Sequence, residues 1–456
     1  MADKFDVVVI GAGPGGFRAA KRCAQRGAKV AVVEKEFIGG VCLNWGCIPL
    51  KALLATAHTI LSAKRAAEIG VEIGSATPNW PKIQQRKDAI VTGFRKAMTG
   101  TAQALKIKMF NGHSIVTAPN KIEVETNGST VDIQTNKVIL ATGSESIELA
   151  NIPFDGQTVI SSKEALSLPQ IPKSMVIIGG GVIGCEMACV YAAMGTKVTI
   201  VEALPRLLPM EDEWVSRLVE REFKKLGIES ITGVKVTSID KKAMLAKIIL
   251  ENGQIIQAEK ILVSVGRRPA VDKEIVEELN LKMNGPTIVV NEKFETSVPG
   301  VYAIGDVIGT TFLAHGATTE AEVATANATG GDKKMSDYGL IPRVIFTFPE
   351  VASVGKSEEK CKAEGLDISV GKGFFKANGR SVAHNETTGQ IRVVRDNSTN
   401  KIIGVTIVGF MATEFITLAR LLISLGPDEL SRITFPHPTI TETLEDAVKD
   451  AFSQNL

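Results

Sequence analysis

Residues 6–16 read DVVVIGAGPGG, and residues 174–184 read SMVIIGGGVIG. In each stretch an apolar run leads into a glycine-rich turn, which predicts a buried strand followed by a helix. The likeness extends beyond the glycines, because four residues of the first copy recur at the same offset in the second. These pairs are Ala20 and Ala188, Gly27 and Gly195, Lys29 and Lys197, and Glu34 and Glu202. The chain therefore contains one strand–turn–helix–strand unit twice.

The spacing of the glycines in both copies is that of a dinucleotide-binding unit. They are Gly11, Gly13 and Gly16 in the first copy, and Gly179, Gly181 and Gly184 in the second. In such a motif the first glycine makes a tight turn, the second lets the backbone approach a pyrophosphate, and the third lets the helix pack closely on the strand. Glu34 and Glu202 end the second strand of each copy, where an acid hydrogen-bonds the ribose hydroxyls. One motif is weak evidence, but two complete copies favour two bound dinucleotides over ordinary glycine-rich turns.

Two cysteines lie close together in residues 39–51, which read GGVCLNWGCIPLK. Four residues separate Cys42 from Cys47, so their sulfurs can meet if the chain turns sharply. Pro49 suits the first turn of a helix, which places Cys47 near a helix N-terminus with Lys51 one turn on, and both features stabilise a thiolate. Spacing alone also permits a structural disulfide or two buried thiols. Because the pair follows the first dinucleotide motif, we favour a redox dithiol, with a flavin at the first motif and a nicotinamide nucleotide at the second.

The composition is that of an ordinary globular protein. Of the 456 residues, 44% are hydrophobic and 22% charged, and the formal net charge is +2. This balance gives no sign of nucleic acid or a membrane surface as an obligate partner, and no apolar run is expected to span a membrane. Six cysteines are too few and too scattered for a secreted disulfide scaffold. A strand predicted at residues 5–10 leaves no room for a targeting peptide, so we expect a cytoplasmic protein.

The rest of the chain shows no third phosphate-binding motif. Residues 80–106 are charged and periodic and predict a long surface helix, whereas residues 115–140 alternate and predict a β-meander. From Pro342 onward we expect an α+β domain. Its predicted strands lie near residues 344–346, 389–395 and 402–408, and its predicted helices at residues 357–364, 413–425 and 442–450.

Two further polar residues are candidates for the site. His437 lies between two prolines in residues 435–442, which read FPHPTITE, and Glu442 could orient its ring and raise its basicity. The alternative is an ordinary surface-loop histidine. Asp306 follows an apolar strand and a glycine, where it could bond a cofactor hydroxyl or simply cap a turn. No cluster has metal-ligand spacing, so we expect no metal.

Together these segments resemble the flavoprotein disulfide reductases, the class I pyridine nucleotide-disulfide oxidoreductases. The resemblance runs from Phe5 to about Val448. Its motifs are GG-x-C-L-N-x-G-C-I-P-x-K at 39–51, ATG at 141–143, GGG-x-IG-x-E at 179–186, VGR-x-P at 265–269, PGVYAIGD at 299–306, LAH at 313–315 and HPT-x-x-E at 437–442. Leu43, Asn44 and Ile48 favour the lipoamide-type over the glutathione-type members.

The resemblance implies an α/β fold with two Rossmann-like dinucleotide-binding domains, for FAD and NAD, and a C-terminal α+β dimerisation domain. The expected boundaries are an FAD-binding domain with the dithiol at 1–146, an NAD-binding domain at 147–270, a central segment completing the FAD site at 271–340 and an interface domain at 341–456. It also implies a homodimer that serves the lipoyl domains of 2-oxo acid dehydrogenase complexes or of the glycine cleavage system.

Carried over position by position, the resemblance also implies residue roles. The implied FAD contacts are Gly11, Gly13, Gly16, Glu34, Lys51, Gly143, Asp306 and Ala314. The implied NAD contacts are Gly179, Gly181, Gly184, Glu186, Glu202, Val236 and Gly266. Cys42 would exchange with substrate sulfur and Cys47 would face the flavin, while His437, paired with Glu442, would be the base for the dithiol of the other subunit. The implied reaction is the oxidation of protein-bound dihydrolipoamide to lipoamide, with hydride transfer to NAD.

Three positions depart from the usual family pattern. Leu50, Phe348 and Phe435 stand where more polar residues are common, and they make the neighbourhood of the thiols more apolar. Two kinds of alternative function remain open. One is reduction of mercuric ion or of a low-molecular-weight disulfide, although no cysteine follows Cys361 to form the C-terminal pair usual in mercuric reductases. The other is a non-catalytic flavoprotein subunit of a complex.

Overall fold

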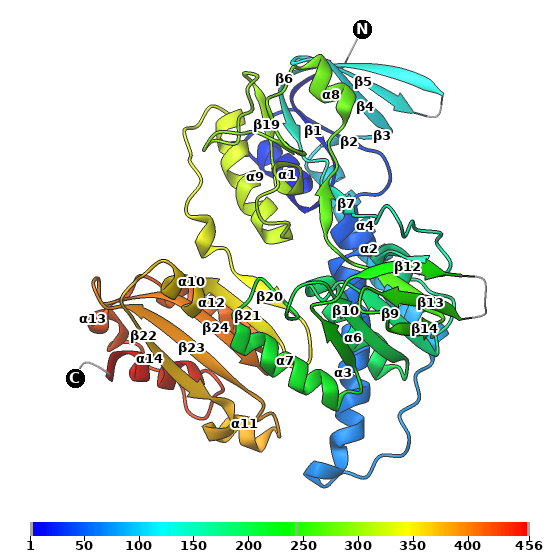
Figure 1. Ribbon diagram of the computed structural model, residues 1–456. Coiled ribbons are helices and arrows are strands. Elements are labelled where there is room, and N and C mark those ends of the chain that lie inside the picture. The colour runs from blue at the N-terminus through cyan, green and yellow to red at the C-terminus, as the bar shows by residue number, and fades with distance from the viewer. Residues whose placement is uncertain (1–2, 127, 242–244, 454–456) are drawn as a thin grey trace. The chain divides into compact units, whose positions relative to one another are not determined.

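The computed structural model describes residues 3–126, 128–241 and 245–453. The chain forms two compact units, and each is assembled from segments that are distant in sequence (Figure 1). The first comprises Met1–Ala52, Gln84–Ile147 and Gly266–Ser336, and the second comprises Leu53–Ile83, Glu148–Val265 and Asp337–Leu456.

The first unit is built on a sheet in the order β3-β2-β1-β6-β5-β4, with β19 paired to β6. Strands β1, β2, β3, β6 and β19 run parallel, and β4 and β5 extend the sheet as antiparallel strands. The bounds are β1 Asp3–Ile10, β2 Val30–Glu34, β3 Lys108–Asn111, β4 His113–Ala118, β5 Lys121–Thr126, β6 Ser129–Leu140 and β19 Val301–Ala303. Val7, Val8 and Val9 are buried, as expected for a parallel strand covered on both faces.

Helix α1 (Pro14–Gln25) packs on β1 and β2 and on helix α9 (Ala314–Ala328) of the same unit. Helix α4 (Trp80–Ala104) confirms the long helix predicted at residues 80–106, and β4, β5 and β6 confirm the meander. The smaller elements of this unit are β7 Ser144–Ser146, β16 Arg267–Pro269, α8 Lys273–Glu278, β17 Met283–Asn284, β18 Thr287–Ile288 and the 3₁₀ turn η2 Gly305–Ile308.

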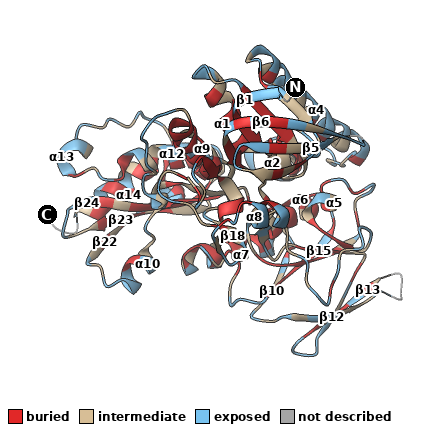
Figure 2. Cartoon of the chain, turned by 90° about the horizontal axis from the view of Figure 1, so that it is seen from above, coloured by how far each residue is buried: buried red, intermediate tan, exposed pale blue. Residues whose placement is uncertain are grey.

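The second unit contains a five-stranded parallel sheet in the order β11-β10-β9-β15-β8. An antiparallel sheet of β12, β13 and β14 shares a buried apolar cluster with it. Figure 2 shows the buried residues concentrated in the sheets and on the inner faces of the helices. The bounds are β8 Val159–Ile160, α5 Ser162–Ala165, β9 Ser174–Ile178, α6 Val182–Ala193, β10 Lys197–Glu202, α7 Glu213–Lys225, β11 Glu229–Thr232, β12 Val236–Asp240, β13 Ala246–Leu250, β14 Ile255–Ala258 and β15 Lys260–Val263.

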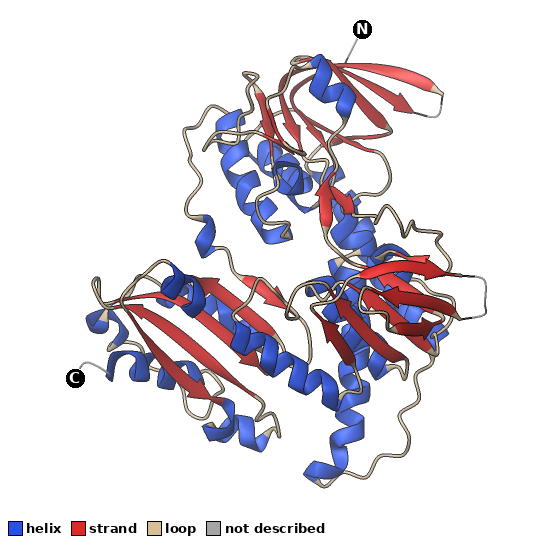
Figure 3. Cartoon of the chain, viewed as in Figure 1, coloured by secondary structure: helices blue, strands red, loops and turns tan. Residues whose placement is uncertain are grey.

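The C-terminal part of the second unit is an antiparallel sheet in the order β20-β21-β24-β23-β22 (Figure 3). Helix α12 packs on β21 and β24, and α14 packs on β22 and β23. The α+β prediction is therefore confirmed, although β21 and β22 were not predicted. The bounds are β20 Arg343–Ile345, β21 Val351–Gly355, α10 Glu358–Ala363, β22 Ile368–Phe374, α11 Gly379–Ala383, β23 Gly389–Asp396, β24 Lys401–Gly409, α12 Ala412–Leu422, α13 Pro427–Leu430 and α14 Glu442–Ser453.

One stretch corrects an expectation about apolar runs. Within the described ranges, the helical stretch Gly40–Ile69 is long and apolar enough, by length and composition, to cross a membrane. The prediction that no run reaches this length was therefore wrong by that criterion. The same stretch carries both cysteines of the predicted dithiol, and buried core helices of other proteins meet the same criterion.

Candidate redox and dinucleotide sites

The two cysteines lie on consecutive helices that meet at Gly46. Cys42 is within α2 (Gly40–Trp45), and Cys47 begins α3 (Cys47–Arg65), so the predicted helix start before Pro49 is confirmed. A Cβ on Gly46 would lie 2.8 Å from the carbonyl oxygen of Val41 and 3.1 Å from the Cα of Cys42. Glycine at this position therefore lets the two short backbone segments approach and brings the cysteines together.

The structure holds Cys42 and Cys47 as thiols that interact with each other. A hydrogen bond with Cys47, followed by burial, raises the pKa of the Cys42 thiol, whereas the charge of Lys51 acts in the opposite direction. Cys47 lies at the N-terminus of α3, where the helix dipole favours an anion. These surroundings favour the protonated thiol at Cys42, and the helix N-terminus favours negative charge at Cys47.

Polar side chains of α2 and α4 hold the turn that precedes the cysteines. The amide nitrogen of Asn44 donates to the carbonyl oxygens of Ile38 and Gly40, at 3.2 and 2.7 Å. Arg95 of α4 donates to the side-chain oxygen of Asn44 and lies 3.9 Å from the centre of the Phe37 ring. Sequence reasoning missed Arg95, because the contact joins residues far apart in the chain.

The first glycine motif has the close approaches that its spacing predicted. Gly11 has a φ of +97°, and a Cβ there would lie 2.3 Å from the carbonyl oxygen of Ala141. A Cβ on Gly16 would lie 2.0 Å from the carbonyl oxygen of Gly11. Glu34 accepts hydrogen bonds from the backbone N–H of Ala12 at 2.8 Å and of Glu36 at 2.9 Å. The carboxylate therefore lies against the glycine-rich turn.

The second motif reproduces the first in detail. Gly179 has a φ of +110°, and a Cβ on Gly184 would lie 2.0 Å from the carbonyl oxygen of Gly179. Glu202 accepts from the backbone N–H of Gly180 at 2.6 Å and of Leu204 at 2.7 Å. The repeat seen in the sequence is therefore also a repeat of hydrogen bonds.

Both motifs fit the pyrophosphate of a dinucleotide. Helix α1 begins after Gly13 and α6 begins after Gly181, and no described side chain caps either N-terminus. A Cβ built on Gly13 or Gly181 would find no described atom within 4 Å. An open approach to uncapped N–H groups at a helix N-terminus is the arrangement that binds phosphate.

Asp306 is part of a polar cluster in the first unit. It lies in η2 and accepts a hydrogen bond from the hydroxyl of Ser144. Arg267 donates to the same hydroxyl at 2.8 Å and to the Ser144 carbonyl oxygen at 2.6 Å. Burial lowers the pKa of Arg267, whereas the nearby negative charges of Asp306 and Cys47 act to raise it. Ser144 and Arg267 were missed, although Ser144 directly follows the ATG motif and Arg267 lies within the VGR-x-P motif.

The remaining predicted cofactor residues fall at the ends of elements or in buried positions. Lys51 lies in α3, Ala314 begins α9, Val236 begins β12, and Gly143 has a φ of +77°. Glu186 is buried in α6 and accepts from the backbone N–H of Phe346 at 2.9 Å. Gly266 immediately precedes β16 in the first unit, whereas the second glycine motif lies in the second unit. Their roles toward FAD and NAD stay predictions.

His437 and Glu442 form the predicted pair. Nδ1 of His437 lies 2.8 Å from Oε1 of Glu442, which is the first residue of α14. Oε2 of the same carboxylate accepts from the backbone N–H of Thr439 at 2.8 Å. The Thr439 hydrogen bond, then that with His437, lowers the pKa of Glu442. The His437 side chain is 80% exposed, so its other ring nitrogen is accessible.

The three apolar departures lie in different surroundings. Leu50 is buried in α3. The Phe348 ring lies 5.9 Å from the His58 ring, and Phe435 is half-buried two residues before His437.

Comparison with known proteins gives consistent matches over the chain. Residues 5–327 match the family described as pyridine nucleotide-disulphide oxidoreductase, and residues 341–448 match its dimerisation domain. A dihydrolipoyl dehydrogenase of Bacillus subtilis is 38% identical over 467 residues, covering 98% of each chain. A dihydrolipoyl dehydrogenase of Geobacillus stearothermophilus is 38% identical over 458 residues, covering 99% of this chain and 97% of the relative.

Solved structures of similar fold include other flavoproteins. The HOCl-induced flavoprotein disulfide reductase RclA from Escherichia coli has a TM-score of 0.87 at 25% identity, covering 97% of this chain and 99% of its own. LpdA from Mycobacterium tuberculosis has a TM-score of 0.91 at 22% identity, covering 98% of this chain and 99% of its own.

Proposed function

Because this chain belongs to the pyridine nucleotide-disulphide oxidoreductase family, we propose that it oxidises protein-bound dihydrolipoamide to lipoamide with NAD as the acceptor. Two kinds of observation support this activity. The Cys42–Cys47 pair lies at the start of α3, beyond the first glycine motif, and relatives similar over almost the whole chain are named dihydrolipoyl dehydrogenases. The observation that carries the proposal is this dithiol in a chain that also contains the His437–Glu442 pair.

His437 acts as the base in the proposed reaction. Glu442 accepts a hydrogen bond from Nδ1–H, and in this tautomer Nε2 has a lone pair that can take a proton from a substrate thiol. Because Glu442 is also held by Thr439, the ring is fixed in orientation. The resulting imidazolium is stabilised by the adjacent carboxylate.

The cysteine pair exchanges its disulfide with the substrate. The substrate thiolate attacks Cys42 of the oxidised pair, the Cys42–Cys47 bond breaks, and Cys47 leaves as a thiolate at the N-terminus of α3. The second substrate sulfur then displaces Cys42, which closes the lipoamide disulfide. The substrate has lost two electrons, and the enzyme holds a dithiol.

The family uses FAD and NAD, and the two glycine motifs fit their pyrophosphates. Bound at the first motif, FAD would supply the two-electron chemistry that connects the dithiol to NAD. Gly13 and Gly181 leave the backbone N–H groups of α1 and α6 open to phosphate. Glu34 and Glu202 present carboxylates to the ribose hydroxyls.

The protein is a homodimer, as the dimerisation domain at residues 341–448 indicates. We propose that His437 serves the dithiol of the partner subunit, which is consistent with its exposure in a single chain. Its substrates would be lipoyl domains of 2-oxo acid dehydrogenase complexes or of the glycine cleavage system, in the cytoplasm.

Thiol mapping tests the proposed half-reaction without NAD. The oxidised protein is mixed with dihydrolipoamide under argon, alkylated and digested, and the labelled cysteines are identified by mass spectrometry. We expect Cys42 and Cys47 to gain the label together, while buried Cys185 and Cys189 do not. If Cys42 and Cys47 remain unlabelled after treatment with dihydrolipoamide, the proposed substrate is wrong.

A further inference from the structure

Arg206 lies on a loop that is hydrogen-bonded at both ends to residues of the second dinucleotide-binding unit. Leu204, near the start of this loop, donates its backbone N–H to Glu202 at 2.7 Å. Leu208 donates its backbone N–H to the carbonyl oxygen of Gly180 at 2.8 Å. Arg206 is therefore held between an anchor on Glu202, the expected ribose contact, and an anchor on the glycine-rich turn.

An arginine at this place matters for the choice between NAD and NADP. NADP differs from NAD by a phosphate on the ribose 2′-oxygen, and a guanidinium near that oxygen binds such a phosphate. Glu202 alone would disfavour the phosphate by charge repulsion. A mobile Arg206 would offset that repulsion, so the position of its guanidinium decides how selective the site is.

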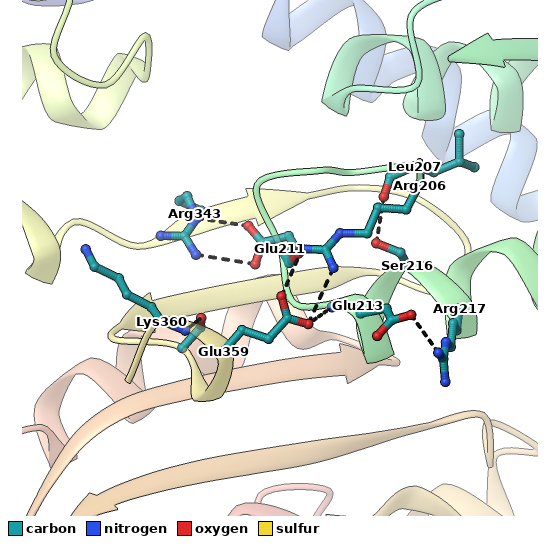
Figure 4. Close-up of polar contacts among 10 residues, drawn as sticks. Arg206, Leu207, Glu211, Glu213, Ser216, Arg217, Arg343, Glu359 and Lys360 are labelled. Atoms are coloured by element: carbon teal, nitrogen blue, oxygen red, sulfur yellow. Dashed lines mark hydrogen bonds and ion pairs between the residues drawn. The ribbon is translucent and has the colours of Figure 1, made fainter. Parts of the chain in front are cut away.

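The guanidinium of Arg206 binds Glu359 and the backbone of Glu211 (Figure 4). Its Nη2 lies 2.9 Å from Oε2 of Glu359, and its Nη1 lies 3.5 Å from Oε1 of the same carboxylate. The same Nη2 donates to the carbonyl oxygen of Glu211 at 3.0 Å. Glu359 belongs to α10 in the C-terminal part of the second unit, so a distant segment of the chain binds the arginine.

The surrounding contacts hold both partners in place. Glu359 also accepts the backbone N–H of Glu213. Arg343 binds the Glu211 carboxylate through two nitrogens at 2.9 and 3.3 Å, and the Ser216 hydroxyl donates to the Leu207 carbonyl oxygen at 2.6 Å. The loop and α10 therefore share one polar network around Arg206.

We propose that Glu359 is a specificity-determining residue, because it binds Arg206 and withholds the guanidinium from the 2′-phosphate of NADP. It acts through Arg206 and not by touching the cofactor, so it is a positioning residue. This inference rests on the proposed function insofar as the second motif binds the nicotinamide nucleotide. It adds a second element of NAD selectivity to Glu202, supplied by the C-terminal segment.

The size of the effect follows from the exposure of the pair. The side chains of Arg206 and Glu359 are 30% and 44% exposed, and ion pairs at such sites are weak. Releasing Arg206 should therefore raise the preference for NADP about five-fold, which corresponds to about 1 kcal/mol. The change should appear in KM and Kd for NADP, whereas kcat with NAD should not change.

The test compares Glu359→Gln with the parent protein. The ratio of kcat/KM for NADP to that for NAD is measured, and the Kd values of both nucleotides are measured by titration calorimetry. We expect both ratios to shift about five-fold toward NADP. Glu213→Gln is the matched control, because it removes the same charge from the same neighbourhood but pairs with Arg217 instead of Arg206.

A double variant separates release of Arg206 from loss of a negative charge. In Arg206→Gln/Glu359→Gln the shift toward NADP should vanish if Arg206 carries it, and should persist if Glu359 merely repels the phosphate. A persistent shift, or no shift in Glu359→Gln alone, overturns the inference. Calorimetry reads NADP and NAD binding without turnover, so an inactive enzyme that still shows the shift would contradict only the proposed function.

Discussion

The two cysteines have different surroundings, and this difference is the basis of a test at the scale of single residues. We expect Cys42→Ser and Cys47→Ser each to abolish lipoamide turnover. Only Cys42→Ser keeps the sulfur at the N-terminus of α3, where a thiolate is favoured. Absorption spectra of the FAD-loaded variants should therefore show a long-wavelength charge-transfer band in Cys42→Ser alone. Equal bands in both variants would reverse the assigned roles.

The exposed histidine can be tested by removing its proton-accepting nitrogen. His437→Gln should slow dihydrolipoamide oxidation roughly 10²–10⁴-fold, because a positioned base is lost. Reduction of an artificial acceptor by NADH should be largely retained, since it needs no base at the dithiol, and the FAD content should not change. His384→Gln is a control, because its ring packs against Phe410, away from Glu442 in the chain. Near-normal lipoamide turnover in His437→Gln would show that the base lies elsewhere, and His315 would be tested next.

Single residues were predicted best where a motif specifies chemistry. The glycines, both cysteines and the His437–Glu442 pair were chosen from local sequence, and the structure places each in the local geometry its motif requires. The supporting contacts were not predictable in this way. Arg95 reaches Asn44, and Glu359 reaches Arg206, across long separations in the chain. No local sequence pattern identifies such a partner, because the two residues come close together only when the chain has folded.

At the scale of elements, the second glycine motif separates two roles of glycine. A Cβ on Gly181 would meet no described atom, whereas a Cβ on Gly184 would lie 2.0 Å from a backbone oxygen. We expect Gly181→Ala to leave the melting temperature unchanged and to raise the Kd for NAD roughly ten-fold, equivalent to about 1.4 kcal/mol. Gly184→Ala should instead lower the free energy of unfolding by about 1–3 kcal/mol through overpacking.

Calorimetric titration and thermal melting of the two variants provide the measurement. The prediction fails if Gly181→Ala binds NAD as tightly as the parent, or if Gly184→Ala is as stable as the parent. Gly93→Ala in α4 is the control, since a Cβ there meets no described atom and the site is far from the motif in sequence.

The periodicity of the sequence predicted which segments are helices and which are strands. It did not predict which strands pair with one another. The apolar runs and the alternation of residues 115–140 predicted strands, and the polar periodicity of residues 80–106 predicted α4. Strands β21 and β22 were not predicted. Both contain glycine, a residue depleted in strands, at Gly355 in β21 and at Gly371 and Gly373 in β22. The pairing of β19 with β6 was also beyond reach, since it joins segments more distant than any local pattern.

At the scale of the whole molecule, the proposed site is shared between subunits. If His437 of one subunit serves the dithiol of the other, a mixed dimer of Cys42→Ser and His437→Gln subunits contains one complete site. Mixing equal amounts of the unfolded variants and refolding them together should restore about a quarter of the parent activity, because about half of the dimers are mixed. Each variant refolded alone should stay inactive. Absence of recovery despite mixed dimers would show that each site is formed within one chain.

The central claim is that the Cys42–Cys47 dithiol transfers electrons from dihydrolipoamide to NAD. Its most direct test is the steady-state turnover of the FAD-loaded dimer. One assay supplies dihydrolipoamide and NAD. The other assays supply NADH or NADPH as the reductant, together with either glutathione disulfide or mercuric ion as the substrate. The account predicts a kcat/KM for dihydrolipoamide with NAD that exceeds the values for both other substrates by at least about a hundred-fold, within the usual enzyme range. Faster reduction of glutathione disulfide or mercuric ion, or no turnover with any substrate, would contradict it.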